Sequence, residues 1–179
     1  MAKFVSENDV VIAASLWLLE RGPIPVRVSM MIPVSSNRYS DERRLSDGLA
    51  AKGMDMARLS FASDGPDIVA ISDRQYWQVE CKGVGSGQPS TYRTSFDRGL
   101  ASVVSYFGTP AELPPECGSR TPFLALAIPS VTEYLSQLRR RVRQSLRLQL
   151  SLWLLLCDPD SLAIVGVSPT SPLPDGSGA

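Results

Sequence analysis

Three polar residues on two predicted strands have the types and the spacing that metal-assisted hydrolysis needs. Asp67 opens one strand, and Glu80 and Lys82 lie two positions apart on the next. Because side chains alternate faces along a strand, Glu80 and Lys82 point to one side and Cys81 to the other. If the two strands pair, Asp67 joins them in a cluster of two carboxylates and one ammonium. Such a cluster can hold a hard divalent cation beside a water molecule that the cation activates.

The pattern of apolar residues and turn signals predicts a mixed sheet with helices on its faces. Helices are expected at residues 6–20, 40–52, 95–107 and 131–150. Strands are expected at residues 26–34, 56–62, 67–71, 76–82, 123–128, 152–157 and 162–167. Loops rich in glycine, serine or proline are expected at 83–90 and 108–122. Apolar segments also carry the tryptophans that are expected in the core, Trp17, Trp77 and Trp153.

The composition is that of an ordinary globular protein. Of the 179 residues, 44% are hydrophobic, and 18 basic side chains balance 18 acidic ones. This length predicts one domain with a sizeable core over residues 1–168, followed by a flexible tail over 169–179. Because the net charge is zero, any nucleic-acid surface must be a local patch. The longest apolar runs, 10–19 and 150–157, are too short to span a bilayer, so no membrane association is expected.

The absence of histidine excludes several rival chemistries. A Ser-His-Asp triad, a histidine-ligated zinc ion and a histidine general base all need an imidazole. The three cysteines are widely spaced and odd in number, and they lack the paired spacing of a metal site. Reduced, mostly buried thiols in a cytoplasmic protein are therefore expected. These cysteines are Cys81, Cys117 and Cys157.

Asp67 and the triplet Glu80-Cys81-Lys82, with a helix before and after them, resemble the motif of the PD-(D/E)XK nuclease superfamily. Its members include restriction endonucleases and archaeal-type Holliday-junction resolvases. The resemblance covers residues 6–130. It implies an α/β, restriction-endonuclease-like fold, in which helices flank a mixed sheet with an αβββαβ core. The C-terminal helix and strand pair suit an extension seen in many members.

The resemblance also implies a role for each residue of the motif. Asp67 and Glu80 would be catalytic metal ligands for Mg²⁺, with Mn²⁺ as an alternative. Lys82 would orient or activate the attacking water. The main-chain carbonyl of Cys81 would be a further metal ligand.

An acid on the first helix often completes the site in this superfamily, and the chain offers two candidates. Glu7 is preferred as a metal ligand because it lies on the helix line of Val11, Ala14 and Leu18, which should face the sheet. Glu20 is the alternative. Glu7 also has a purely structural interpretation, since the helix dipole stabilises any acid in the first turn.

Several polar residues after the triplet are candidates for contact with a nucleic-acid backbone. Three of them are Gln88, Arg93 and Arg98. Three others lie four apart on the predicted helix 131–150, as a basic strip opposite its apolar stripe: Arg139, Arg143 and Arg147. The alternative for both groups is a solvated helix face without a partner.

The sequence therefore predicts a magnesium-dependent nuclease that acts on DNA. One alternative is a non-catalytic nucleic-acid- or protein-binding domain on the same fold, which the neutral charge favours. Another is an unrelated α/β domain, with Asp67 as a turn residue far from Glu80, and with Glu80 and Lys82 as an ion pair on an exposed sheet face.

The quaternary structure and the order of the sheet stay open at this point. The segment 35–60, before Asp67, is longer than in a minimal nuclease, and it is a candidate dimerisation or substrate-reading element. A homodimer is the simplest arrangement for a nuclease that cuts both strands of a duplex.

Overall fold

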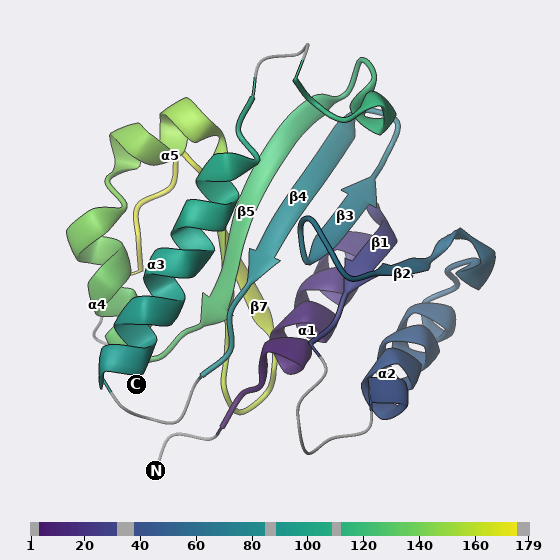
Figure 1. Cartoon of the computed structure of the whole chain (residues 1–179), viewed down its shortest axis with the longest axis horizontal. Helices are drawn as coiled ribbons and strands as arrows, with labels where there is room; N and C mark the ends of the chain where they lie inside the picture. Colours follow the sequence, from purple (N-terminus) through teal and green to yellow (C-terminus); the bar gives the residue numbers. More distant parts are fainter. Residues whose placement is uncertain (1–3, 32–37, 85–88, 109–111, 175–179) are drawn as a thin grey trace.

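The apolar runs of the sequence pair into one mixed sheet (Figure 1). The structure is a computed structural model that describes residues 4–31, 38–84, 89–108 and 112–174. The strands of this part of the chain are β1 (Ile24–Ser29), β2 (Ser60–Ala62), β3 (Ile68–Ile71), β4 (Gln75–Cys81), β5 (Thr121–Pro129), β6 (Leu152–Cys157) and β7 (Ile164–Val167). Their order across the sheet is β2-β1-β3-β4-β5-β6-β7.

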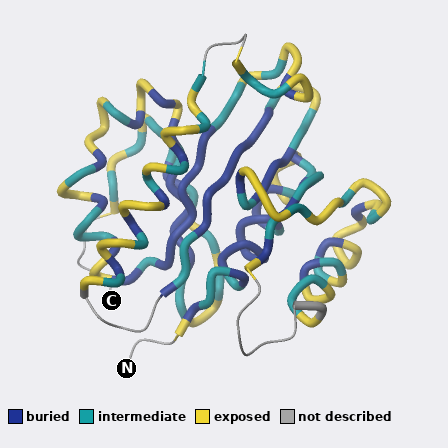
Figure 2. Tube along the Cα trace, in the orientation of Figure 1, coloured by how far each residue is buried: buried dark blue, intermediate teal, exposed yellow. Residues whose placement is uncertain are grey.

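The sheet contains both parallel and antiparallel strand pairs. β1 runs parallel to β2 and antiparallel to β3, and β3 runs antiparallel to β4. β4, β5 and β6 are parallel, and β7 closes the sheet antiparallel to β6. Figure 2 shows that the central strands are buried along most of their length. Burial on both faces explains why the sequence of β5 is a continuous apolar run.

Helices cover both faces of the sheet. They are α1 (Glu7–Glu20), α2 (Arg38–Ala51), α3 (Pro89–Ser105), α4 (Thr132–Arg141) and α5 (Gln144–Leu150), with short 3-10 helices at Met56–Arg58 and Pro115–Cys117. Trp17 of α1 packs against Trp153, which pairs with Ala125 of β5. The next residue, Leu126, points to the opposite face, where it lies against Gly99 of α3. α1 and α3 therefore enclose the sheet from its two sides.

Several expectations about the core are confirmed. The three tryptophans pack together, with ring centroids 5.4 to 6.3 Å apart. The three cysteines are free and buried. A capping box formed by Ser6 and Asp9 starts the first expected helix, α1. Within the described ranges, no helix is long and apolar enough to cross a membrane.

Three predicted elements differ from the structure by more than two residues at a boundary. The strand expected at 26–34 ends at Ser29, and residues 32–34 lie outside the described residues. The strand expected at 56–62 is a 3-10 helix followed by the short edge strand β2. The helix expected at 95–107 starts earlier, at Pro89, because proline suits the first helical turn, where no N–H partner is needed.

The prediction of a single helix over 131–150 is wrong. Val142 has φ −107° and ψ 78°, and Arg143 is extended, so two helices replace the expected one. Because of this break, Arg147 is buried and not part of a solvent-exposed strip. The basic strip is therefore wrong as a continuous feature, although Arg139 and Arg143 are exposed.

Candidate functional site

Two antiparallel strands bring the acids of the motif to one place. Asp67 directly precedes β3, and Glu80 and Cys81 are the last two residues of β4. Ile68 pairs with Val79, which puts Asp67 beside the end of β4. The main-chain N–H of Cys81 donates a hydrogen bond to Asp67 Oδ2 at 2.7 Å. The strand pairing therefore holds the first carboxylate against the triplet.

The Lys82 ammonium lies at the centre of the cluster. Its Nζ atom is 2.9 Å from Glu80 Oε1, 3.4 Å from Glu7 Oε2 and 3.9 Å from Asp67 Oδ2. The same atom donates to the main-chain carbonyl of Cys81 at 2.7 Å. The exposed fractions of these charged side chains range from 8% to 18%. This geometry contradicts the alternatives of distant carboxylates and of an ion pair on an exposed sheet face.

Of the two candidate helix acids, Glu7 is the one at the cluster. Gly83, directly after the triplet, approaches the start of α1 closely. A Cβ atom on Gly83 would lie 2.4 Å from the main-chain nitrogen of Glu7 and 2.6 Å from the carbonyl carbon of Ser6. Only a residue without a side chain allows α1 to begin here. Glu20 lies at the other end of α1, where it is exposed and pairs with Lys52.

Two residues around the cluster belong to no motif and were missed by the sequence analysis. Tyr106, directly after α3, donates its hydroxyl hydrogen to Glu80 Oε2, with the two oxygens 2.8 Å apart. Gly99 of α3 faces the stem of Lys82, and a Cβ atom there would lie 3.0 Å from Lys82 Cγ. Both contacts depend on how α3 is seated on the sheet, and no signal within the helix sequence identifies either residue.

The cluster holds more acids than bases in a poorly solvated position. Burial, reinforced by Glu80, raises the pKa of Asp67 to about 7 although Lys82 opposes the shift. Burial also raises the pKa of Glu7. For Lys82, burial would lower the pKa, but the neighbouring carboxylates, first those of Glu7 and Asp67, outweigh it and raise the pKa. Three acids thus share one cation, and a second cation would relieve the remaining negative charge.

The donor atoms suit a hard divalent cation with few protein ligands. In the part of the chain that the structure describes, no group of three His, Cys, Asp or Glu side chains has the geometry to hold a metal ion. Asp67, Glu80 and the Cys81 carbonyl nevertheless all approach the same ammonium. Mg²⁺ keeps several waters and takes only one or two carboxylates, so these oxygens fit its requirements. Mn²⁺ accepts the same kinds of ligand.

Three residues after the triplet were expected to contact a nucleic-acid backbone. One of them, Arg98, borders the cluster. It lines a cavity of about 600 Å³ whose wall also includes three charged residues of the cluster. Arg93 is exposed and lies 4.0 Å from Asp97, one turn further along α3. Gln88 lies outside the described residues.

The chain matches no family model, no curated protein and no solved structure. Its function therefore has to be argued from the chemistry of the cluster. That chemistry consists of two carboxylates at the ends of neighbouring strands, a main-chain carbonyl and a helix acid around one half-buried ammonium. Such an arrangement can bind a divalent cation and hold a positive group next to it.

Proposed function

We propose that this protein is a metal-dependent nuclease that hydrolyses phosphodiester bonds in DNA. The observation that carries the proposal is the convergence of Asp67, Glu80 and the Cys81 carbonyl on the Lys82 ammonium. Asp67 and Glu80 would hold Mg²⁺ or Mn²⁺, with the Cys81 carbonyl as a further ligand. Such a cation, when bound, neutralises phosphate charge and lowers the pKa of a water molecule.

The protein's own groups would orient the ligands and the attacking water. Lys82, surrounded by acids, keeps its proton, so it donates a hydrogen bond and stabilises developing negative charge. Tyr106 engages Glu80 Oε2, which leaves Oε1 facing the ammonium. Asp67 Oδ2 is likewise engaged by the Cys81 N–H. Each carboxylate would then offer one oxygen, as suits a cation that keeps most of its waters.

The order of the elements supports a restriction-endonuclease-like fold as part of this proposal. Apart from α2 and β2, which lie between β1 and β3, and two short 3-10 helices, the elements from α1 to β5 have the αβββαβ order that the resemblance implies. β2 is an additional edge strand contributed by the long segment before Asp67. α4, α5, β6 and β7 would form the C-terminal extension.

Metal-dependent cleavage by the purified chain tests the proposal. Supercoiled plasmid should be cleaved with Mg²⁺ or Mn²⁺ and left intact with a chelator. Lys82→Ala and Asp67→Ala should abolish cleavage, because they remove the ammonium and a metal ligand, while thermal unfolding stays cooperative. Lys52→Ala is the matched control, since it removes a lysine from the exposed pair with Glu20 and should cleave like the wild type. Equal cleavage by the wild type and Lys82→Ala would contradict the proposal.

A non-catalytic nucleic-acid- or protein-binding domain is the second candidate function. The net charge of zero favours it, as does the lack of a three-ligand metal group among the described residues. Calorimetric titration with MgCl₂ and MnCl₂ separates the two candidates. Binding that Asp67→Ala removes supports the nuclease, whereas no binding at millimolar metal supports the binding domain.

A further inference from the structure

Two cavities meet at the cluster and form one groove, named here the α1–α3 groove. The larger cavity has a volume of about 600 Å³ and is lined by Glu7, Glu80 and Lys82 of the cluster, and the smaller has about 250 Å³ and lies at the start of α1. The residues that line both cavities are Glu7, Met31 and Ser95. A ligand bound at the cluster can therefore extend into the smaller cavity without leaving the groove.

The two halves of the α1–α3 groove differ in chemistry. The larger half carries the cations Lys82 and Arg98 beside the carboxylates. The smaller half is mostly apolar, and its wall includes Phe4, Met31 and Val84. Phe4 is 66% exposed and Met31 is 55% exposed, so two large apolar side chains face solvent next to a charged site. Apolar walls with a few charged groups at one end are typical of a ligand site.

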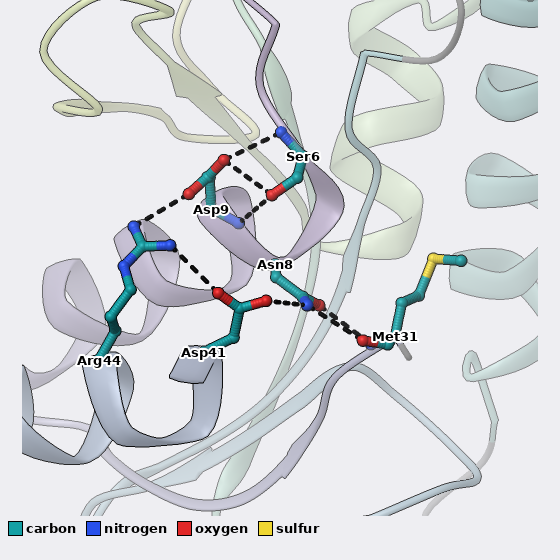
Figure 3. Close-up of polar contacts among 6 residues, drawn as sticks. All are labelled: Ser6, Asn8, Asp9, Met31, Asp41 and Arg44. Atoms are coloured by element: carbon teal, nitrogen blue, oxygen red, sulfur yellow. Dashed lines mark hydrogen bonds and ion pairs between the residues drawn. The ribbon is translucent and has the colours of Figure 1, made fainter. Parts of the chain in front are cut away.

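Buried polar contacts hold the apolar half in place (Figure 3). Asn8 is 2% exposed, and its side chain exchanges two hydrogen bonds of 3.0 Å with the main chain of Met31. Asn8 Nδ2 also donates to Asp41 Oδ2 at 2.7 Å, which ties the same point to α2. Figure 3 shows the Met31 side chain extending away from this network. The Val84 N–H donates to the Val5 carbonyl at 2.7 Å, so both walls have a fixed backbone.

We propose that the smaller cavity binds an unpaired nucleobase beside the scissile phosphodiester, which makes single-stranded DNA the preferred substrate. This inference rests on the proposed function, because it takes the phosphate to lie at the cluster. A nucleotide joins an anionic phosphate to a flat ring, and the groove joins Lys82 and Arg98 to Phe4 and Met31. A base stacks on an aromatic side chain such as Phe4 only when it is free of its complementary strand.

Equilibrium binding tests the inference independently of cleavage. The full chain is titrated, with Ca²⁺ in place of Mg²⁺, against a labelled oligothymidylate and against the same strand with abasic spacers in place of every base. The wild type should bind the strand that carries bases about tenfold more tightly, as expected for one stacked base. Phe4→Ala should bind the two strands equally. Phe61→Ala, which removes a partly exposed phenylalanine from β2, is the matched control and should keep the preference.

The following results would overturn the inference. They are equal binding of both strands by the wild type, an undiminished preference in Phe4→Ala, and tighter binding of duplex than of single strand by the wild type. Binding of neither strand also overturns it, and would leave the cavity to another class of ligand. Failure of the proposed function is distinguishable, because metal-dependent cleavage would then be absent while the base preference that depends on Phe4 persists.

Discussion

At the scale of the residue, each motif carboxylate has one oxygen engaged by a neighbour. The Cys81 N–H occupies Asp67 Oδ2, and the Tyr106 hydroxyl occupies Glu80 Oε2. These bonds restrict the rotation of the two carboxylates, and in the proposed metal site they would leave the other oxygen of each to meet the cation, although Oε1 of Glu80 also faces Lys82. Contacts of this kind orient metal ligands, and their loss typically costs about 10- to 100-fold in metal affinity or activity.

Removal of the Tyr106 hydroxyl should weaken the site without unfolding the protein. Tyr106→Phe is expected to lower Mn²⁺ affinity and cleavage by about tenfold, because Glu80 loses the donor that orients it. Calorimetric titration measures the affinity, and thermal unfolding should show little change. Tyr92→Phe removes a hydroxyl near the start of α3 and serves as the control. An unchanged Mn²⁺ affinity in Tyr106→Phe would contradict this role.

The buried carboxyl of Asp67 makes stability depend on pH. Burial raises its pKa from 3.8 to about 7, so the folded state binds more protons than the unfolded state between these values. The stability of the metal-free wild type should therefore fall as the pH rises from about 4 to about 7. Asp67→Asn keeps the hydrogen-bond acceptor without the charge. The gain in free energy of unfolding of Asp67→Asn over the wild type should be larger at pH 8 than at pH 5, by about 2 kcal/mol.

Chemical denaturation in the presence of a chelator measures this difference. Glu20→Gln is the control, because Glu20 is exposed and pairs with Lys52, and no such gain is expected there. If the difference in free energy of unfolding between Asp67→Asn and the wild type does not vary with pH, ionisation of Asp67 does not destabilise the folded state.

At the scale of the element, the site depends on the place where α1 begins. Ser6 caps the helix, and Gly83 lets the backbone of this first turn pass close to the end of β4. Glu7 therefore faces Lys82, which directly follows β4 and lies 75 residues later in the chain. A small displacement of α1 would separate the helix acid from Lys82 without changing either residue.

A side chain at Gly83 should disrupt this approach. Gly83→Ala is expected to lower the free energy of unfolding by about 1–3 kcal/mol, because its Cβ atom would meet main-chain atoms that cannot turn aside. Gly48→Ala is the matched control, since its Cβ atom would meet only the tip of the Leu16 side chain, at 3.3 Å. Chemical denaturation compares the two variants, and equal stability would contradict the close approach at Gly83.

At the scale of the whole molecule, α4 and α5 hold the segment that follows β7. Arg147 donates to the carbonyls of Ser168 at 3.0 Å and Ser171 at 2.7 Å. The side chains of Arg139 and Gln144 donate to other carbonyls of residues 168–174. The described part of the C-terminal segment is thus joined to the helical layer by side-chain donors.

Loss of the Arg147 guanidinium should destabilise the protein. Arg147→Ala removes a buried guanidinium and leaves the half-buried carbonyls of Ser168 and Ser171 without their donor, so a decrease of about 2 kcal/mol in the free energy of unfolding is expected. Arg143→Ala should stay within about 0.5 kcal/mol of the wild type, because Arg143 is exposed. Denaturant titration distinguishes the two, and similar losses in both variants would argue against a specific role for Arg147.

Local patterns were enough to predict the main strands and the residues of the motif. Alternation along β4 puts Glu80 and Lys82 on one face, and continuous apolar runs mark the central strands. These features depend on near neighbours in the chain, so they can be read without the fold. The types of residue at the cluster, and the absence of histidine, likewise follow from the sequence alone.

Contacts between distant segments were decided only by the tertiary structure. The contact of Glu7 with Lys82, the bond from Tyr106 to Glu80, and the burial of Arg147 all depend on where a helix meets the sheet. The α1–α3 groove depends in the same way on the spacing of two helices from opposite faces. The sequence therefore determined which chemical groups are available, and the packing of helices on the sheet decided which of them meet. The physical reason is that alternation along a strand is a local property, whereas the seating of a helix depends on all the side chains between it and the sheet.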